Sequence, residues 1–581
     1  MERGVTVGIA TSSQQWIGYW GYGNPTTLAQ SLKRIIQQKA GNHRWQLSSQ
    51  PAENGILATL SASGLLSENQ TDTTSADAWV RVGEDYLTLG REAFGKVPVY
   101  WLQLDQVIWY ASRLQLLLPL VASPSVSLAA LYGYSCFSYV PTPLTPVENI
   151  YALPAGIEKT WRIDNSGNLL SPHSLHLLDW QESPQPIDNE QEAIAQLQTL
   201  LKASVERQIN DLKDEPVGVM LSGGLDSSVV AALLVQAGVK VRAYTLNLGD
   251  SSIPEYPYAQ QVAKWLNIPL TKVDATPRQI QSALIPTIQA LDLPFGDGVT
   301  VPLFLLHQAA SRDTNIIFNG EGGDQLFAGW TNKPLIAASI YQDEQKNSNT
   351  SFAYQYLRTF HRLWGYEAQV FQPAAYAEIQ HLQPEKWLYP ALDSTSTPSL
   401  LHRLRRASLM LKGAQNIHPR ATNLAFANGL QVRSPFCDLP LAQWTFQLSG
   451  KLCLQGACEK YILKRAVEPW LPPEIVWRKK RGMGVPLTSW YLHELWRSLG
   501  IWLNPGMLQA EGRWQPDLAA RIACGDLGGM IQGRRIGEIL WLLMTWQIWR
   551  SHVLGESVTN CSWNHPFWLP YPVWRFSKRW L

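Results

Sequence analysis

Two short strings combine glycine, hydroxyl and carboxylate groups in a way that suits phosphate chemistry. The first, V-G-V-M-L-S-G-G-L-D-S-S at Val217–Ser228, predicts a buried strand, a glycine turn and a helix that Ser227 and Ser228 open. Backbone N–H groups and the positive end of a helix dipole make such a turn an anion site. It is not a P-loop, because the G-x-x-x-x-G-K-[ST] spacing is absent. A carboxylate beside a phosphate is unfavourable without a cation between them, so Asp226 implies Mg²⁺.

The second string, N-G-E-G-G-D-Q-L-F-A-G-W, follows a predicted strand at Asn315–Phe318. It places Glu321 and Asp324 close together, with glycines between them. Loops at the carboxyl ends of strands build the sites of α/β sheets. The alternative is a plain surface turn, because such turns also favour glycine and acidic residues.

Both strings resemble signatures of one enzyme family. S-G-G-L-D-S-S is similar to the pyrophosphate-binding loop of the N-type ATP pyrophosphatases, most closely the asparagine synthetase family, and the second string is similar to that family's G-E-G-x-D-E-L-F-x-G-Y. The resemblance implies a ligase that cleaves ATP between its α and β phosphates and adenylates a carboxylate. It implies that Asp226 and Asp324 bind Mg²⁺ and that Glu321 acts as the base for the attacking amine. It also implies an ATP site made of Leu221, Ser222, Gly223, Gly224, Asp226, Ser227, Ser228, Leu246, Asn319 and Gly320.

Two lysines also match the family. Lys460, in E-K-Y-I-L-K-R-A, stands where the family has a catalytic lysine that stabilises charge at the adenylating centre; the alternative is a solvated helical lysine. Lys480 lies in R-K-K-R-G-M-G-V-P-L, which resembles the family's R-x-K-x-G-F-G-V-P. Asp297, in L-P-F-G-D-G, is a weaker site candidate that could equally be a turn residue. Gln325 replaces a second family glutamate, so one charge is missing.

The departures from the family concern the source of nitrogen. Glutamine-dependent members use an N-terminal cysteine as a glutaminase nucleophile, but here Glu2 follows Met1 and no cysteine precedes Cys136. A glutamate cannot replace a thiolate in attack on an amide. Asn423 also takes the place of a family arginine near the acyl acceptor, which suggests a substrate other than free aspartate. We therefore expect no glutamine hydrolysis.

The predicted fold class is α/β. Short apolar segments such as Trp79–Val82 and Val107–Ala111 recur in residues 1–160, which predicts a β-rich, α+β domain. G-R-E-A-F-G-K-V-P-V-Y-W, at Gly90–Trp101, resembles the N-terminal domain of the family. The resemblance implies that residues 1–160 form a degenerate, glutamine-amidotransferase-like domain similar to Ntn hydrolases. A polar linker is expected at 161–190. Strands and helices then alternate as in βαβ units, which predicts a doubly wound parallel sheet. The resemblance implies that residues 191–555 form an ATP pyrophosphatase domain with this sheet and a helical C-terminal part. The tail at 556–581 is rich in tryptophan and proline and has no functional interpretation.

Composition narrows the range of partners. A net charge of +2 with only 16% charged residues argues against an electrostatic nucleic-acid binder. The 6 cysteines form no C-x-x-C pair, so neither zinc nor a disulfide framework is indicated. The longest apolar runs are too short to cross a membrane and no signal peptide opens the chain, so we expect a cytoplasmic protein. The expected partner is a small-molecule or peptide carboxylate, with a homodimer or a precursor peptide as further candidates.

The predicted activity is therefore an ATP-dependent, AMP-forming amide ligase. Three nitrogen sources stay open: free ammonia with aspartate, an amine within the same substrate, or an amine on a separate molecule. The missing cysteine and the altered acceptor segment favour an amine-bearing substrate, as in the lasso-peptide cyclases and β-lactam synthetases, which the chain resembles. Asparagine formation from aspartate and ammonia is the alternative. The rival from another class is an inactive nucleotide-binding scaffold.

Overall fold

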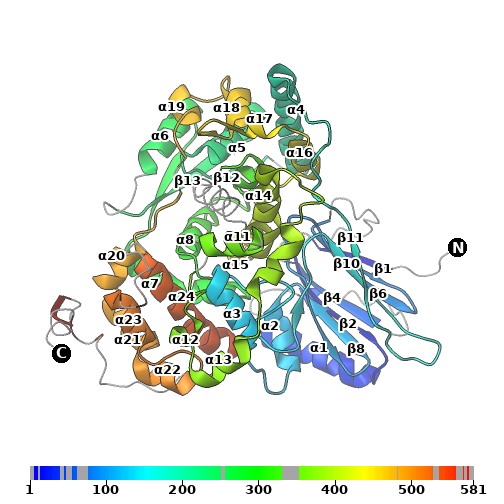
Figure 1. Ribbon diagram of the computed structural model, residues 1–581. Coiled ribbons are helices and arrows are strands. Elements are labelled where there is room, and N and C mark those ends of the chain that lie inside the picture. The colour runs from blue at the N-terminus through cyan, green and yellow to red at the C-terminus, as the bar shows by residue number, and fades with distance from the viewer. Residues whose placement is uncertain are drawn as a thin grey trace.

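The computed structural model describes residues 6–10, 14–39, 45–46, 55–61, 76–212, 214–249, 255–329, 352–360, 362–480, 482–525, 527, 535–557, 567, 569 and 572–574. Antiparallel sheets form its N-terminal part, a parallel sheet its middle and helices most of its C-terminal part (Figure 1). No helix within those ranges is long and apolar enough to cross a membrane.

Two antiparallel sheets face one another in the N-terminal part. The first has the order β1 (Thr6–Ala10), β5 (Ala78–Val82), β6 (Tyr86–Arg91), β10 (Ile157–Arg162), β11 (His173–His176). The second has the order β3 (Trp45–Gln46), β4 (Gly55–Ser61), β2 (Gln14–Gly21), β8 (Val107–Ala111), β7 (Tyr100–Leu104), β9 (Tyr151–Ala152). Trp16 and Trp20 of β2 pack with Val80 and Leu89 between the sheets. The range 161–190, predicted as a linker, holds the end of β10 and all of β11.

The middle of the chain forms a doubly wound parallel sheet, as predicted. Its order is β14 (Leu270–Asp274), β13 (Val241–Asn247), β12 (Val217–Met220), β15 (Ile316–Phe318), β16 (Gln431–Arg433), and every neighbouring pair is parallel. The core on one face includes α4 (Glu190–Ile209), α5 (Leu225–Gln236) and α6 (Tyr256–Trp265). The core on the other face includes α7 (Pro277–Ala290), α8 (Thr300–Ala310) and α15 (His418–Ala427). Chain order reverses between β12 and β15, which is where such sheets bind ligands.

Helix α5 begins earlier than predicted. It starts at Leu225, whereas Ser227 and Ser228 were expected to open it. Both serine hydroxyls instead donate to the Gly224 carbonyl from within the first turn, at 3.2 and 2.7 Å. Asp226 therefore lies in the first turn, where the helix dipole favours a negative charge.

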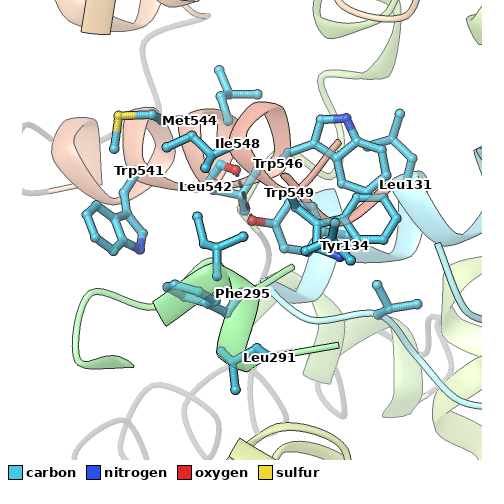
Figure 2. Close-up of a cluster of buried hydrophobic side chains, with 14 of the residues drawn as sticks. Leu131, Tyr134, Leu291, Phe295, Trp541, Leu542, Met544, Trp546, Ile548 and Trp549 are labelled. Atoms are coloured by element: carbon cyan, nitrogen blue, oxygen red, sulfur yellow. Dashed lines mark hydrogen bonds between the residues drawn. The ribbon is translucent and has the colours of Figure 1, made fainter. Parts of the chain in front are cut away.

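The C-terminal part is built around one buried helix, α24 (Ile536–Trp549), as its sequence predicted. Every residue of α24 except Glu538 is buried. Figure 2 shows Trp546 and Trp549 of this helix beside Tyr134 of α3 (Leu128–Phe137). Trp541 stands apart from them, and its ring centroid lies 6.1 Å from that of Phe295. The Tyr134 hydroxyl donates to the Leu542 carbonyl at 2.9 Å, so the N-terminal and C-terminal parts share a core.

The described residues contain further α-helices and strands. They are α1 (Pro25–Lys39), α2 (Leu114–Leu117), α9 (Gly323–Leu326), α11 (Phe352–Phe360), α12 (Glu367–Val370), α13 (Pro373–Ile379), α14 (Leu400–Ser408), α16 (Leu439–Thr445), α17 (Gly450–Cys453), β17 (Leu454–Gln455), β18 (Cys458–Glu459), α18 (Tyr461–Val467), α19 (Pro473–Val476), α20 (Leu487–Leu492), α21 (Trp496–Leu503), α22 (Pro505–Glu511) and α23 (Leu518–Cys524).

Candidate active site

A cleft of about 660 Å³ opens where β12, β13 and β15 end. We call one part of it the loop end, lined by Leu221, Ser222, Gly224, Asp226, Ser227, Leu246, Asn319, Gly320, Asp324, Lys460 and Lys480. We call the other part the far end, lined by Phe137, Ser138, Tyr139, Asp297, Arg362, Lys412, Asn416, Arg420 and Glu538. Glu321 also lines the cleft and connects the two ends. The cleft thus gathers all of the predicted site residues except Gly223 and Ser228.

The first loop turns tightly between β12 and α5. The Ser222 hydroxyl accepts a hydrogen bond from the Gly224 N–H at 3.2 Å and lies 3.1 Å from the Ser227 hydroxyl. Gly223 has φ +68°, and a Cβ there would lie 2.5 Å from the backbone of Tyr258. A side chain at Gly223 would therefore be both strained and blocked by α6. Ser228, which does not line the cleft, is fully buried behind the loop.

The second loop packs directly on the first. A Cβ at Gly320 would lie 2.7 Å from the Ser227 nitrogen, and one at Gly323 would lie 2.5 Å from the Asp226 carboxylate. Both positions therefore need glycine for close backbone approach. This contact brings Asp226 and Asp324 from two different loops to one place.

A buried lysine joins these two carboxylates. The Lys460 ammonium pairs with one oxygen of Asp226 and lies 2.6 Å from Asp324 Oδ1. Lys480 pairs with the other oxygen of Asp324 at 2.8 Å. Lys460 is only 2% exposed, which contradicts the alternative of a solvated helical lysine.

The two carboxylates differ in electrostatic environment. Burial raises the pKa of Asp226, although Lys460 opposes the shift. Burial would also raise the pKa of Asp324, but Lys460 and Lys480 together lower it to about 2. Asp324 is therefore a carboxylate at any physiological pH.

The carboxylates fit Mg²⁺ in the company of phosphate. Asp226 Oδ1 is buried and has no hydrogen-bond partner, so it is available to a cation. In the part of the chain that the structure describes, no group of three or more histidine, cysteine or acidic residues could hold a metal ion by itself. Mg²⁺ commonly uses one or two carboxylates together with substrate phosphates and water. Asp226 and Asp324 match that donor set.

Glu321 lies at the boundary of the loop end and the far end. Its N–H donates to Asn319 Oδ1 at 3.1 Å, and its carboxylate lies 4.0 Å from Arg420. Burial raises the pKa of Glu321, and Arg420 partly opposes that shift. A carboxylate with a raised pKa, facing a cleft, suits a general base.

Asp297, the weaker candidate, holds Arg420 in place. Its carboxylate lies 2.7 Å from Arg420 and accepts hydrogen bonds from Asn416 at 3.1 Å and from the Thr300 hydroxyl at 2.6 Å. Burial would raise the pKa of Asp297, but Arg420 and these hydrogen bonds lower it. Asp297 therefore remains ionised and holds the Arg420 guanidinium in position.

The far end contains charged residues that the sequence reasoning did not identify. Arg362 pairs with Glu538 at 3.0 Å and donates to the Ser138 hydroxyl at 3.1 Å. Ser138 closes α3 of the N-terminal part, so that part forms a wall of the cleft. Glu538 could have been noticed from the sequence, because it is the single charged residue in a helix that is otherwise mostly apolar. Arg362 could not have been noticed in this way, because its partners lie far away in the sequence.

Comparison with known proteins places these features in a family. The sequence model described as Asparagine synthase matches residues 196–551, which is more than half of the chain and includes both loops and both lysines. The chain belongs to the asparagine synthase family. Members of this family are ATP-dependent ligases that form carbon–nitrogen bonds.

Relatives of this asparagine synthase family member are distant. The glutamine-hydrolyzing asparagine synthetase 1 of Bacillus subtilis is 22% identical over 437 residues, which cover 71% of this chain and 67% of that protein. A Mycobacterium tuberculosis protein with the provisional name of glutamine-hydrolyzing asparagine synthetase is 24% identical over 501 residues, 81% of this chain and 75% of its own. Among solved structures, an NH3-dependent NAD synthetase from Campylobacter jejuni is 15% identical and covers 35% of this chain and 96% of its own, with a TM-score of 0.19. That score is too low to bear on fold or function.

Proposed function

We propose that this protein is an AMP-forming amide ligase that adenylates a carboxylate and joins it to an amine without hydrolysing glutamine. The observation that carries the proposal is the meeting of two glycine loops beyond β12 and β15, which brings Asp226 and Asp324 together over the first turn of α5. A helix N-terminus with two carboxylates for Mg²⁺ suits the pyrophosphate of ATP.

In the first step, a substrate carboxylate oxygen attacks the α-phosphorus of ATP, and the bond to pyrophosphate breaks. Ser222, Ser227 and the N–H groups of the first turn of α5 bind the departing pyrophosphate. Lys460 and Lys480 offset the negative charge that develops there. Mg²⁺ on Asp226 and Asp324, when bound, supplies further charge stabilisation.

In the second step, an amine nitrogen attacks the acyl carbon, and AMP leaves. Glu321 takes the proton that the nitrogen loses. Burial raises the pKa of Glu321, which makes it a stronger base than an exposed glutamate, and Arg420 opposes this rise. The products are an amide, AMP and pyrophosphate.

The N-terminal part, residues 1–160, holds no accessible thiol, and this supports an amine substrate. No cysteine occurs among residues 1–135, and the Cys136 thiol is wholly buried in α3, where burial raises its pKa well above its ordinary value. A buried thiol with a raised pKa is a poor nucleophile. We therefore favour an amine-bearing substrate, as in macrolactam formation.

Asparagine formation from aspartate and ammonia is the second candidate. The names of the relatives favour it, since several are asparagine synthetases. The sequence argument from Asn423 does not weigh against it, because that residue faces a small cavity rather than the cleft, so its replacement of a family arginine does not bear on substrate binding there.

The deciding experiment is pyrophosphate release from ATP and Mg²⁺ in parallel reactions. Aspartate with ammonia, aspartate with glutamine, amine-bearing acids and no addition are compared. Release with amine-bearing acids supports the proposal, and release only with aspartate and ammonia identifies an asparagine synthetase. Glutamate formation from glutamine would contradict the proposal that the protein does not hydrolyse glutamine. ATP binding without turnover of any acid would favour an inactive scaffold.

A further inference from the structure

Glu321, the proposed base, is held through both of its backbone groups. Its N–H donates to Asn319 Oδ1 at 3.1 Å, and the Ser434 hydroxyl donates to the same oxygen at 2.7 Å. Its carbonyl oxygen accepts a hydrogen bond from the Cys437 thiol, with 3.6 Å between sulfur and oxygen. Ser434 and Cys437 both belong to the short segment that follows β16. One segment of the chain therefore holds the backbone of Glu321 from two directions.

The second loop also packs directly on the Cys437 thiol. Gly322 follows Glu321 with φ +101°, and a Cβ at Gly322 would lie 3.2 Å from Cys437 Sγ. The Cys437 residue is only 4% exposed. A buried thiol behaves as a small apolar group with a weak S–H donor, so it can fill this narrow space and still bond to the Glu321 carbonyl.

A buried histidine in turn holds the thiol. Cys437 Sγ lies 3.5 Å from His418 Nδ1, and His418 is 2% exposed. Burial lowers the pKa of His418 to about 3 and raises the pKa of Cys437 well above its ordinary value, so both groups are neutral at physiological pH. A thiol has one proton, so donation to Glu321 leaves the sulfur to accept a hydrogen bond from the His418 ring.

The His418 ring contacts two further parts of the molecule. It lies edge-on to Phe94 of the N-terminal part, with 6.1 Å between the ring centroids. A Cβ at Gly413, in the π-helix η4 (Leu409–Ile417), would lie 3.3 Å from His418 Nε2. The ring therefore has little room to turn away from Cys437, and the N-terminal part helps to hold it there.

We propose that Cys437 and His418 are positioning residues, which hold Glu321 where its carboxylate can take a proton from the attacking amine, with Phe94 of the N-terminal part as their support. This inference rests on the proposed ligase function. It gives the N-terminal part a contribution to amide formation that requires no glutaminase. Because Glu321 acts only in the second step, the pair should affect amide formation and leave the attack on ATP unchanged.

The test of this role measures the two steps separately, with L-aspartate and with 6-aminohexanoate as acids. Exchange of labelled pyrophosphate into ATP reports the first step, and amide formation at subsaturating ammonia reports the second. Cys437→Ala and His418→Phe should each slow amide formation by about threefold to tenfold, the range for one neutral hydrogen bond, and leave pyrophosphate exchange unchanged. Cys437→Ser keeps a donor and should retain amide formation.

The double variant shows whether the two side chains act as one unit. Cys437→Ala combined with His418→Phe should slow amide formation no more than the more affected single variant, because both act through the Glu321 carbonyl. Losses that multiply would mean that the two residues act independently and would contradict the proposed pair.

Cys453→Ala provides the matched control. Cys453 is buried like Cys437, but it lies in α17, and no residue of that helix lines the cleft. This control loses the same group from a core position and should keep both rates. Equal losses in the two steps for Cys437→Ala, or no loss in the second, would overturn the positioning role while leaving the ligase proposal intact.

A second readout does not depend on turnover. Hydrogen–deuterium exchange of a peptide that covers residues 316–327 is followed by mass spectrometry in the full chain without added substrate. Cys437→Ala and His418→Phe should speed this amide exchange by about threefold to tenfold, and Cys453→Ala should not. Faster amide exchange in a protein that activates no acid would support the backbone contact although the ligase proposal fails. Unchanged amide exchange would contradict the contact, whatever the activity.

Discussion

The two ends of the cleft are assembled in different ways. At the loop end, two short strings and two lysines supply the charges, and these charges bind one another through Lys460 and Lys480. At the far end, the charges come from the N-terminal part, the parallel-sheet part and α24, and Lys412 has no counter-ion among the described residues. The difference teaches that the charges of the loop end lie in short sequence motifs, whereas the charges of the far end come from distant parts that carry no such motif. Under the proposed function, nucleotide binding is therefore visible in the sequence, and recognition of the acid depends on how these parts pack.

The largest expected effect concerns Asp324 at the loop end. Asp324→Asn keeps the shape of the side chain but removes the negative charge that pairs with Lys460 and Lys480 and would bind Mg²⁺. Pyrophosphate release should therefore fall by roughly a thousandfold or more. Asp85→Asn, on an exposed N-terminal turn, should be neutral. An Asp324→Asn variant with near wild-type activity would contradict the metal assignment.

Lys460 should affect both activity and stability. Lys460→Met leaves Asp226 buried without its cation, which should reduce the free energy of unfolding by about 3–5 kcal/mol and pyrophosphate release by about a hundredfold. Adding Asp226→Asn removes the uncompensated charge, so it should restore stability but not activity. Denaturant unfolding and the pyrophosphate assay test the two effects, and recovery of activity in the double variant would contradict the role of Lys460.

Substitution of two glycines distinguishes the cost of backbone strain from the cost of close packing. Gly223 lies in the first loop, whereas Gly238 follows the end of α5. Gly223 has φ +68° and Gly238 has φ +77°, but a Cβ meets backbone at 2.5 Å only at Gly223, whereas nothing lies within 4 Å at Gly238. Gly238→Ala should therefore cost about 1 kcal/mol. Gly223→Ala should cost about 1–3 kcal/mol more and raise the KM for ATP. Equal thermal stability of the two variants would show that the approach of α6 is unimportant.

The smallest expected effect links the two ends through Arg420. Under the proposed function, activity requires the ionised form of Glu321. Burial raises the pKa of this carboxyl group, and Arg420 opposes the rise. Arg420→Met should raise the pKa of Glu321 further, so the acidic limb of the pH–rate profile should move to higher pH by about one unit. Arg420→Lys should move it less. An acidic limb that stays in place would mean that a group other than Glu321 is the base.

The comparison of the two ends also explains which features could be predicted from the sequence. The parallel sheet, the two loops and the burial of α24 were predictable, because buried strands, glycine turns and apolar helices leave short-range patterns. The pairing of Arg420 with Asp297 was not, because it joins residues 123 positions apart. The start of α5 at Leu225 was missed because a glycine N-cap carries no side-chain signal.

The packing of α3 against α24 has a consequence for how the molecule unfolds. The Tyr134 hydroxyl donates a hydrogen bond to the backbone of α24. Ser138 lies four residues later in the chain and forms part of the cleft wall. Elements near both ends of the chain therefore belong to one core. Local opening of either part would expose the tryptophans of α24, so the described parts should melt in a single calorimetric transition, with the cleft lost at the same temperature as the N-terminal sheets.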